Sequence, residues 1–113
     1  MVVEPVARDT APAILTAALM LEDEPDAMLL VTPSDHVIGD LPAFLQAVKA
    51  GERAAARGAL VTFGVTPDRA ETGYGYLELP GAPQDGSALR LKSFREKPDQ
   101  ASAEKMLEAS NYL

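Results

Sequence analysis

Two unbroken apolar runs, at residues 27–32 and 59–64, form the strongest pattern in this chain. Each run has the length of a β-strand, and neither alternates with polar positions. A continuous apolar run of this length is typical of a strand that is covered on both faces, as in a parallel sheet. We therefore predict adjacent or near-adjacent parallel strands at these two positions.

Helical patterns precede both runs. The first helix is predicted to begin near Ala11, with Thr10 as its cap, and the second to begin at Leu41, with Asp40 as its cap. Gly58 is placed to end the second helix. Two valines near the start of the chain are typical of the end of a preceding strand. The order strand, helix, strand, helix, strand predicts an α/β fold, with right-handed crossovers and a parallel sheet that carries helices on both faces.

The pattern changes after the second run. A polar, glycine-containing loop leads to a short alternating strand at residues 76–79, and a turn rich in Gly and Pro separates it from a second alternating strand at 89–92. These two strands predict a short excursion that resembles a β-hairpin. A last helix is predicted after Pro98-Asp99, with Ala103, Met106 and Leu107 as its apolar residues.

Composition narrows the choice of function. The 113 residues suit one domain, and 10 basic against 17 acidic residues give a net charge of −7. This charge argues against binding to a nucleic acid polymer, which needs a basic face, but a few local cations or a metal ion can still hold a small phosphorylated ligand. The apolar stretches are too short to span a membrane, and residues 1–5 have no signal-peptide pattern, so we expect a cytoplasmic protein.

Four polar clusters follow the predicted strands: residues 4–10, 34–36, 71–75 and 96–98. Ligands of open parallel sheets bind outside the carboxyl ends of the strands, so these clusters predict one composite site.

Each cluster also has a plain structural interpretation. Residues 4–10 suit a loop and a helix cap, and Asp35 suits a turn residue that bonds its own backbone. His36, as the single histidine, is more often structural than catalytic, and Glu96-Lys97 suits a solvated ion pair. The two glycines that flank Tyr74 favour either a close approach of the backbone to a ligand or a special turn.

Taken together, five segments resemble the mannose-1-phosphate guanylyltransferases in their order and spacing. The segments are Glu4–Ile14, Pro33–His36, Phe63–Val65, Glu71–Tyr76 and Phe94–Asp99. The resemblance covers essentially the whole chain and implies a Rossmann-like nucleotidyltransferase fold. It also implies guanylyl transfer from GTP to mannose 1-phosphate, with Mg²⁺ as the required cofactor.

The resemblance also implies roles for residues of the nucleotide half of the site. Glu4 corresponds to a residue that reads the base edge, and its carboxylate suits the donor pair of guanine. Arg8 and the helix start at Thr10 would lie beside the nucleotide and supply a cation and free N–H groups. Asp35 corresponds to the metal-holding, catalytic aspartate of the family.

The remaining implied roles concern the sugar phosphate. Tyr74 and Gly75 correspond to the turn whose backbone contacts the sugar, and Glu96 to the acceptor for its hydroxyls. Lys97 corresponds to the catalytic cation that binds the sugar's phosphate.

The chain also departs from the family pattern. It holds no glycine-rich, basic phosphate loop and no second metal-binding aspartate, and it has Asp9 and Ser34 where Asn and Ala are more usual. We therefore expect residues 1–113 to form a single, partial nucleotidyltransferase domain that is inactive when isolated. Two alternatives stay open: a non-catalytic nucleotide-sugar-binding module of the same fold, and a sister enzyme for another sugar 1-phosphate. Exposed sheet edges also leave a homodimer open.

Overall fold

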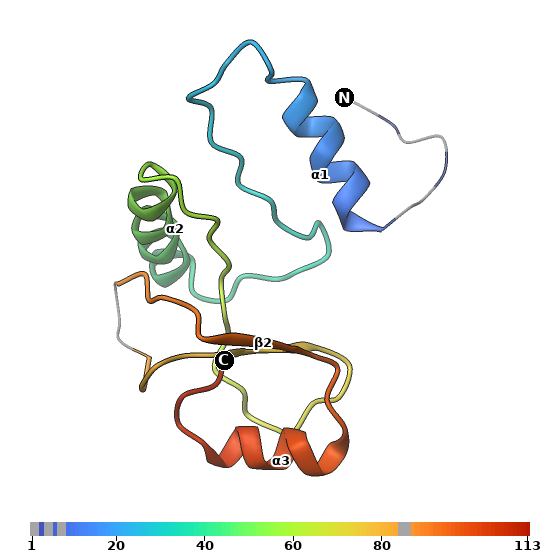
Figure 1. The fold of residues 1–113 in the computed structure, drawn as a ribbon, viewed down its shortest axis with the longest axis vertical. Helices are drawn as coiled ribbons and strands as arrows, with labels where there is room; N and C mark the ends of the chain where they lie inside the picture. Colours follow the sequence, from blue (N-terminus) through green and yellow to red (C-terminus); the bar gives the residue numbers. More distant parts are fainter. Residues whose placement is uncertain (1–2, 4–5, 7–8, 84–86) are drawn as a thin grey trace. The chain divides into compact units, whose positions relative to one another are not determined.

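The computed structural model describes residues 3, 6, 9–83 and 87–113 (Figure 1). The chain divides into two compact units, Met1–Gly39 and Asp40–Leu113, which are described separately below. The first unit contains α1 (Thr10–Leu19). The second contains α2 (Leu41–Ala55), β1 (Gly75–Glu78), β2 (Ser93–Glu96) and α3 (Gln100–Glu108).

Helix α1 lies where the sequence predicts a helix, but its cap differs from the prediction. Thr10 is the first helical residue, and Asp9 occupies the capping position. The Asp9 side chain makes no capping hydrogen bond, and its backbone has φ 62°. The prediction of Thr10 as the cap is therefore wrong. None of the residues of α1 is buried, so its apolar stripe does not face a core within the first unit.

The apolar run at 27–32 does not form a strand in the structure. Its four largest side chains, Met28, Leu29, Leu30 and Val31, are 44–52% exposed. An apolar run favours burial, but a strand also needs a hydrogen-bonded neighbour. Among the described residues no segment pairs with this run, which explains why it is irregular.

Helix α2 has the start and the end that the sequence predicts. The Asp40 carboxylate accepts a hydrogen bond from the backbone N–H of Ala43 at 2.9 Å, which satisfies one of the free donors of the first turn. Gly58, with φ 84°, takes the left-handed conformation that commonly follows a helix. Local chemistry therefore determines both ends of this helix.

The second apolar run, at 59–64, packs on α2 without forming a strand. A Cβ atom at Gly51 would lie 3.0 Å from the Phe63 ring and 3.3 Å from a methyl group of Val61, so glycine lets this run approach the helix closely. Leu60, in contrast, is fully exposed. The predicted parallel pairing of the two apolar runs is thus absent from the described residues.

The second unit is built around an antiparallel hairpin. Strands β1 and β2 pair with Gly75 opposite Glu96 and Glu78 opposite Ser93. The predicted strand at 76–79 is observed one residue earlier, whereas the predicted strand at 89–92 is wrong. The backbone N–H of Lys92 donates to the Glu78 carbonyl at 2.8 Å. The hydrogen bonding with β1 therefore begins at Lys92, the last residue of the predicted strand. The alternation of polar and apolar residues does not by itself determine whether residues 89–92 or 93–96 pair with β1.

Residues 111–113 form the other neighbour of β1. The backbones of Leu77 and Leu113 exchange two hydrogen bonds, at 2.8 and 3.1 Å, and Leu79 donates to the Asn111 carbonyl at 2.9 Å. Strand β1 therefore has a hydrogen-bonded neighbour on each side, which is the arrangement that holds a short strand in place.

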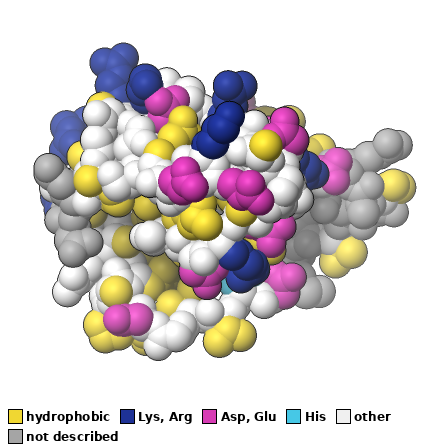
Figure 2. Space-filling model, turned by 90° about the horizontal axis from the view of Figure 1, so that it is seen from below, with side chains coloured by type: hydrophobic (Ala, Val, Ile, Leu, Met, Phe, Trp, Pro, Cys, Tyr) yellow, Lys and Arg dark blue, Asp and Glu magenta, His cyan; other side chains and the backbone are white. Residues whose placement is uncertain are grey.

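Helix α3 lies alongside the hairpin and supplies the main core cluster (Figure 1). Ala103 and Met106 pack against Tyr76 of β1, and Ala103 is completely buried. Asp99 caps the helix by accepting from the Ser102 N–H at 2.8 Å. The core is small, and Figure 2 shows hydrophobic side chains at the surface between acidic and basic ones.

Candidate functional site

The hairpin brings the four residues predicted to bind the sugar phosphate together. Gly75 stands opposite Glu96 in the β1–β2 pairing. The backbone N–H of Lys97 donates to the carbonyl of Tyr74 at 3.2 Å, one step beyond the last pair of the ladder. Two motifs that are separate in the sequence therefore form one continuous backbone surface at this end of the hairpin.

Glycine is the only residue type that fits at position 75. A Cβ atom there would overlap the ring of Phe94 on the neighbouring strand, and it would also lie 3.2 Å from Glu96 Oε2. The aromatic ring thus covers the glycine across the strands, a diagonal packing that long side chains reach easily. The glycine leaves the backbone beside Glu96 without a side chain of its own.

Two non-glycine residues among those described have a positive φ, and both lie in the predicted site segments. Asp9 has φ 62° and Lys97 has φ 42°. A side chain in this region costs about 1–3 kcal/mol and is retained where the surroundings enforce it, commonly at ligand sites. At Lys97 the enforcing contact is its hydrogen bond to Tyr74, which joins the bend after β2 to the loop before β1.

Glu96 and Lys97 present opposite charges side by side. Lys97 Nζ lies 3.8 Å from Glu96 Oε1, and the two side chains are 65% (Lys97) and 60% (Glu96) exposed. An exposed pair of this kind contributes little to stability, so both groups are free to reorient toward a ligand. The pair offers a cation for a phosphate and an acceptor for hydroxyl groups within one short segment.

Glu71 and Tyr76, which lie in a predicted site segment but receive no role from the sequence, hold the loop before β1. The buried Tyr76 hydroxyl accepts from the Glu71 N–H at 2.8 Å, and Glu71 Oε1 accepts from the Gly73 N–H at 3.0 Å. The available signal was a carboxylate two residues before a glycine, a spacing at which acidic side chains close local turns.

The residues predicted for the nucleotide and the metal belong to the first unit. Thr10 is exposed in the first turn of α1, and Asp35 is exposed in a turn that follows the apolar run. Glu4 and Arg8 lie outside the described residues. The carboxylate of Asp35 fits the chemistry of Mg²⁺, which typically takes one or two carboxylates together with substrate phosphates. No group of three acidic or histidine side chains within the described ranges could hold a metal ion by itself.

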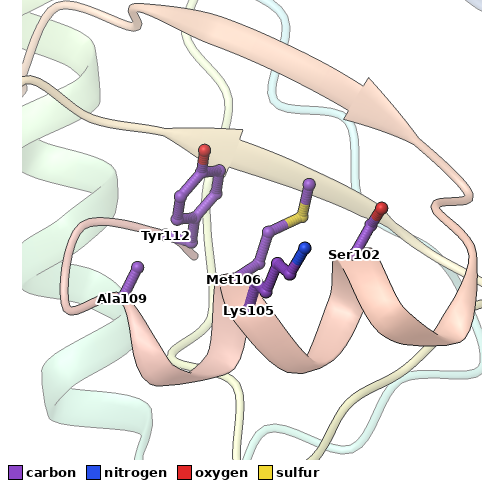
Figure 3. A pocket seen from close by; sticks show the side chains of 5 residues that line it. All are labelled: Ser102, Lys105, Met106, Ala109 and Tyr112. Carbon is purple, nitrogen blue, oxygen red and sulfur yellow. The ribbon is translucent and has the colours of Figure 1, made fainter.

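A shallow hollow of about 300 Å³ lies elsewhere on the second unit, along α3 (Figure 3). Its lining residues are Ser102, Lys105, Met106, Ala109 and Tyr112. None of them was predicted as a site residue. Since the hollow is wide open and contains a single charged side chain, it does not mark the chemistry that the sequence predicts.

The carboxylates with shifted pKa values serve the structure of the second unit. Hydrogen bonds from Lys92 Nζ and Ser93 Oγ lower the pKa of Glu78 below its ordinary value of 4.5. The Ser102 N–H at the start of α3 lowers the pKa of Asp99 in the same direction. Both carboxylates are therefore ionised at neutral pH and stabilise the hairpin and the helix start.

Comparison with known proteins identifies the family. The family model described as nucleotidyl transferase matches residues 1–113. The chain belongs to this family. Its relatives include the mannose-1-phosphate guanylyltransferase RfbM of Salmonella typhimurium, which is 46% identical over 98% of this chain. The alginate biosynthesis protein AlgA of Pseudomonas aeruginosa is 44% identical over 96%.

This nucleotidyl transferase chain spans about a quarter of the length of those relatives, 24% of RfbM and 23% of AlgA. Two solved structures share its fold at 38% identity. One is named mannose-1-phosphate geranyltransferase, from Thermus thermophilus, with a TM-score of 0.85 over 98% of this chain and 32% of that one. The other is named mannose-6-phosphate isomerase, from Helicobacter pylori, with a TM-score of 0.83 over 96% of this chain and 39% of that one.

These similarities confirm the predicted family and fold class: a partial α/β domain of the nucleotidyl transferase fold. The parallel pairing predicted for the two apolar runs is the part that the described residues do not form. Within the same residues, no helix combines the length and apolar content needed to cross a membrane.

Proposed function

We propose that the protein containing this nucleotidyl transferase chain transfers a guanylyl group from GTP to mannose 1-phosphate, giving GDP-mannose and pyrophosphate. The observation that carries the proposal is the pairing of two motifs at the end of the hairpin. Gly75 stands opposite Glu96, and Lys97 is bonded to Tyr74. The names of relatives at 42–46% identity over nearly the whole chain support the same substrate.

Each group at this end of the hairpin suits one part of a sugar phosphate. Lys97 supplies a cation for the phosphate, and Glu96 accepts hydrogen bonds from sugar hydroxyls. At Gly75 the Phe94 ring fills the space where a side chain would stand, so we assign the sugar contact to the backbone groups of Tyr74 and Gly75. Together they orient one phosphate oxygen, which is the task of a site that positions its substrate.

In the proposed reaction this oxygen attacks the α-phosphorus of GTP. A new P–O bond forms, the bond to the bridging oxygen breaks, and pyrophosphate leaves. A phosphate monoester is largely ionised at neutral pH, so no side chain has to remove a proton first. The protein's contribution is then to position two anions and to screen their repulsion.

The proposed roles toward the nucleotide and the metal belong to Glu4, Arg8, Thr10 and Asp35. Glu4 would accept from the guanine edge, and Arg8 with the helix start at Thr10 would meet the phosphates. Asp35 would hold Mg²⁺, which supplies charge screening for the phosphates when it is bound.

The test is product formation by the whole purified protein. It is incubated with GTP, mannose 1-phosphate and MgCl₂, and GDP-mannose and pyrophosphate are quantified. Parallel reactions replace mannose 1-phosphate by glucose 1-phosphate, and GTP by UTP or dTTP. We expect the GTP and mannose 1-phosphate pair to give the highest kcat/KM. Faster turnover of another pair would assign the site to a sister enzyme, and binding without turnover of any pair would assign it to a non-catalytic module.

A further inference from the structure

The loop at residues 70–74 leads directly into β1 and ends at the proposed sugar contact. Two of its amide groups donate hydrogen bonds to side chains that have no predicted role in ligand binding. Glu71 is central: its N–H donates to the Tyr76 hydroxyl at 2.8 Å, and its Oε1 accepts from the Gly73 N–H at 3.0 Å. One residue therefore ties the loop to the core with its backbone and closes the loop with its side chain.

The anchor of this loop is rigid. Tyr76 is 3% exposed and packs in the cluster with Ala103 and Met106. Ala70, at the start of the loop, is partly buried against the same cluster. Because the tyrosine ring is fixed by packing, its hydroxyl presents an acceptor at a fixed place.

The second oxygen of the Glu71 carboxylate faces another partner. Arg69 Nε lies 3.5 Å from Glu71 Oε2, and the Glu71 side chain is only 36% exposed. The carboxylate is therefore oriented from both sides, by a guanidinium and by the Gly73 amide. An oriented carboxylate holds a loop more firmly than a freely rotating one, because less side-chain entropy is lost with each bond.

The far end of the loop is fixed by the bend after β2. The Tyr74 carbonyl accepts from Lys97, the residue with φ 42°. The loop is thus held near each end, at Glu71 by the Tyr76 hydroxyl and at Tyr74 by Lys97, and the bond between Glu71 and Gly73 closes it internally. Gly75, the next residue, pairs with Glu96.

We propose that Glu71 and the Tyr76 hydroxyl are positioning residues for the sugar phosphate. They hold the loop in its ligand-ready conformation, so that Tyr74, Gly75 and Lys97 are in place before the ligand arrives. Ordering a loop during binding reduces affinity, and a loop that is ordered beforehand avoids this loss. The inference rests on the proposed function, because it assigns these two residues to the mannose 1-phosphate half of the same site.

The conservative variant Tyr76→Phe tests the hydroxyl alone, since the ring and its packing remain. The matched control is Tyr112→Phe, which removes a hydroxyl from a tyrosine that packs, partly buried, against the same cluster (Figure 3). For the carboxylate, Glu71→Ala removes the Oε1 acceptor, whereas Glu71→Gln keeps a carbonyl oxygen that can accept from Gly73. The whole protein is used, with mannose 1-phosphate and GTP varied separately.

We expect Tyr76→Phe and Glu71→Ala to raise the KM for mannose 1-phosphate about three- to tenfold, the size that one or two hydrogen bonds contribute. The KM for GTP, and the KM values of Tyr112→Phe and Glu71→Gln, should stay within about twofold of wild type. Amide hydrogen exchange at Gly73 should be faster in the two affected variants. The unfolding temperatures of these variants are measured in parallel. A lower unfolding temperature together with equal rises in the KM for mannose 1-phosphate and the KM for GTP would indicate general damage to the fold and would overturn the positioning role.

In one outcome the wild-type protein turns over mannose 1-phosphate, while Tyr76→Phe and Glu71→Ala keep the wild-type KM and the wild-type exchange rate at Gly73. This outcome would overturn the inference and leave the proposed function intact. A wild-type protein without this turnover would overturn the proposed function and the inference with it. A rise in the KM for mannose 1-phosphate in Glu71→Ala that Glu71→Gln reverses would support the role of the acceptor oxygen.

Discussion

The two compact units differ in how much of their apolar surface they bury. In the second unit, side chains from α2, β1 and α3 are buried, with Tyr76 and Ala103 almost or completely inaccessible. In the first unit none of the described residues is buried, and the apolar run at 27–32 is about half exposed. The proposed sugar-phosphate residues therefore stand on packed structure, whereas Thr10 and Asp35 stand on a unit without a described core.

This difference separates two ways of forming a site. Near Gly75 the geometry is fixed by strand pairing, by Phe94 and by the bond between Tyr74 and Lys97. At Asp35 the exposed turn supplies charge, and packing within its unit does not fix the side chain. Electrostatic groups near transferring phosphates contribute through charge, whereas contacts to a sugar depend on shape. We therefore expect substitutions in the two units to affect different kinetic constants.

The largest expected effect is on turnover by the whole protein. Asp35→Asn keeps the size of the side chain but removes the charge that suits a hard cation, and we expect kcat to fall roughly 100-fold or more. Lys97→Ala should mainly raise the KM for mannose 1-phosphate, by about tenfold or more, because a phosphate loses its cation. Steady-state kinetics with each substrate varied separately distinguish the two patterns.

The control for Asp35 is its neighbour His36, because the proposed reaction needs no imidazole. His36→Gln should keep most of the activity. An inactive His36→Gln variant beside an active Asp35→Asn variant would show that the metal role has been assigned to the wrong residue.

The second prediction compares methionines in the two units. Met106 is 8% exposed in the core cluster, and Met106→Ala should lower the free energy of unfolding by about 2–3 kcal/mol, because it leaves a cavity. Met20 is 66% exposed, and Met20→Ala should change it by less than about 0.5 kcal/mol. Urea unfolding of the chain, followed by circular dichroism, measures both. Equal losses would mean that the first unit has a core of its own.

The sequence predicts best what is decided locally. The sequence predicts Asp40 as a cap, because a carboxylate three residues before a free N–H is a local arrangement, and this bond is present. The predicted helix start after Asp99 is also observed, and Asp99 makes the same kind of bond. Gly58 was likewise recognised as a helix end. At Thr10 the same reasoning failed, because the chain enters α1 through Asp9 in a positive-φ conformation that composition does not reveal.

The strands were harder to predict, because strand formation depends on a distant partner. The apolar runs carry the composition of buried strands, yet within the described residues they have no hydrogen-bonded neighbour. Residues 89–92 and 93–96 are both short and partly alternating, and only the pairing with β1 selects the second. The candidate site follows the same rule: the motifs assign roles to Gly75 and Lys97, whereas the part that Glu71 and Tyr76 play in the same segment becomes visible only through their hydrogen bonds.

The third prediction compares the starts of two helices. The Asp40 carboxylate caps α2, so Asp40→Ala should cost about 1 kcal/mol of stability. Asp9 holds the same position before α1 without a capping bond and with φ 62°, so Asp9→Gly should not destabilise the chain. Helical signal during urea unfolding reports both variants. A loss in Asp9→Gly as large as that in Asp40→Ala would indicate that the Asp9 side chain stabilises α1 after all.

The smallest expected effect is a pH dependence confined to the second unit. The hydrogen bond from Lys92 lowers the pKa of Glu78 in the folded chain, and the bond to Glu78 raises the pKa of Lys92. A lowered carboxylate pKa means that the contribution to stability is complete above the unfolded value of about 4.5 and is lost as the pH falls through the folded value. A raised lysine pKa means that its contribution is present below about 10.5 and is lost as the pH rises beyond that value.

We therefore expect the unfolding temperature of the wild-type chain to fall below about pH 4.5, and Glu78→Gln to show a smaller fall, because its side chain has no charge to lose. Glu52→Gln, which alters an exposed carboxylate on α2, should retain the wild-type profile. Thermal unfolding measured from about pH 3 to about pH 7 compares the three proteins, a range that spans the titration of carboxylates. Identical acid profiles for wild type and Glu78→Gln would mean that the contact between β1 and Lys92 does not contribute to the stability of the folded unit in solution.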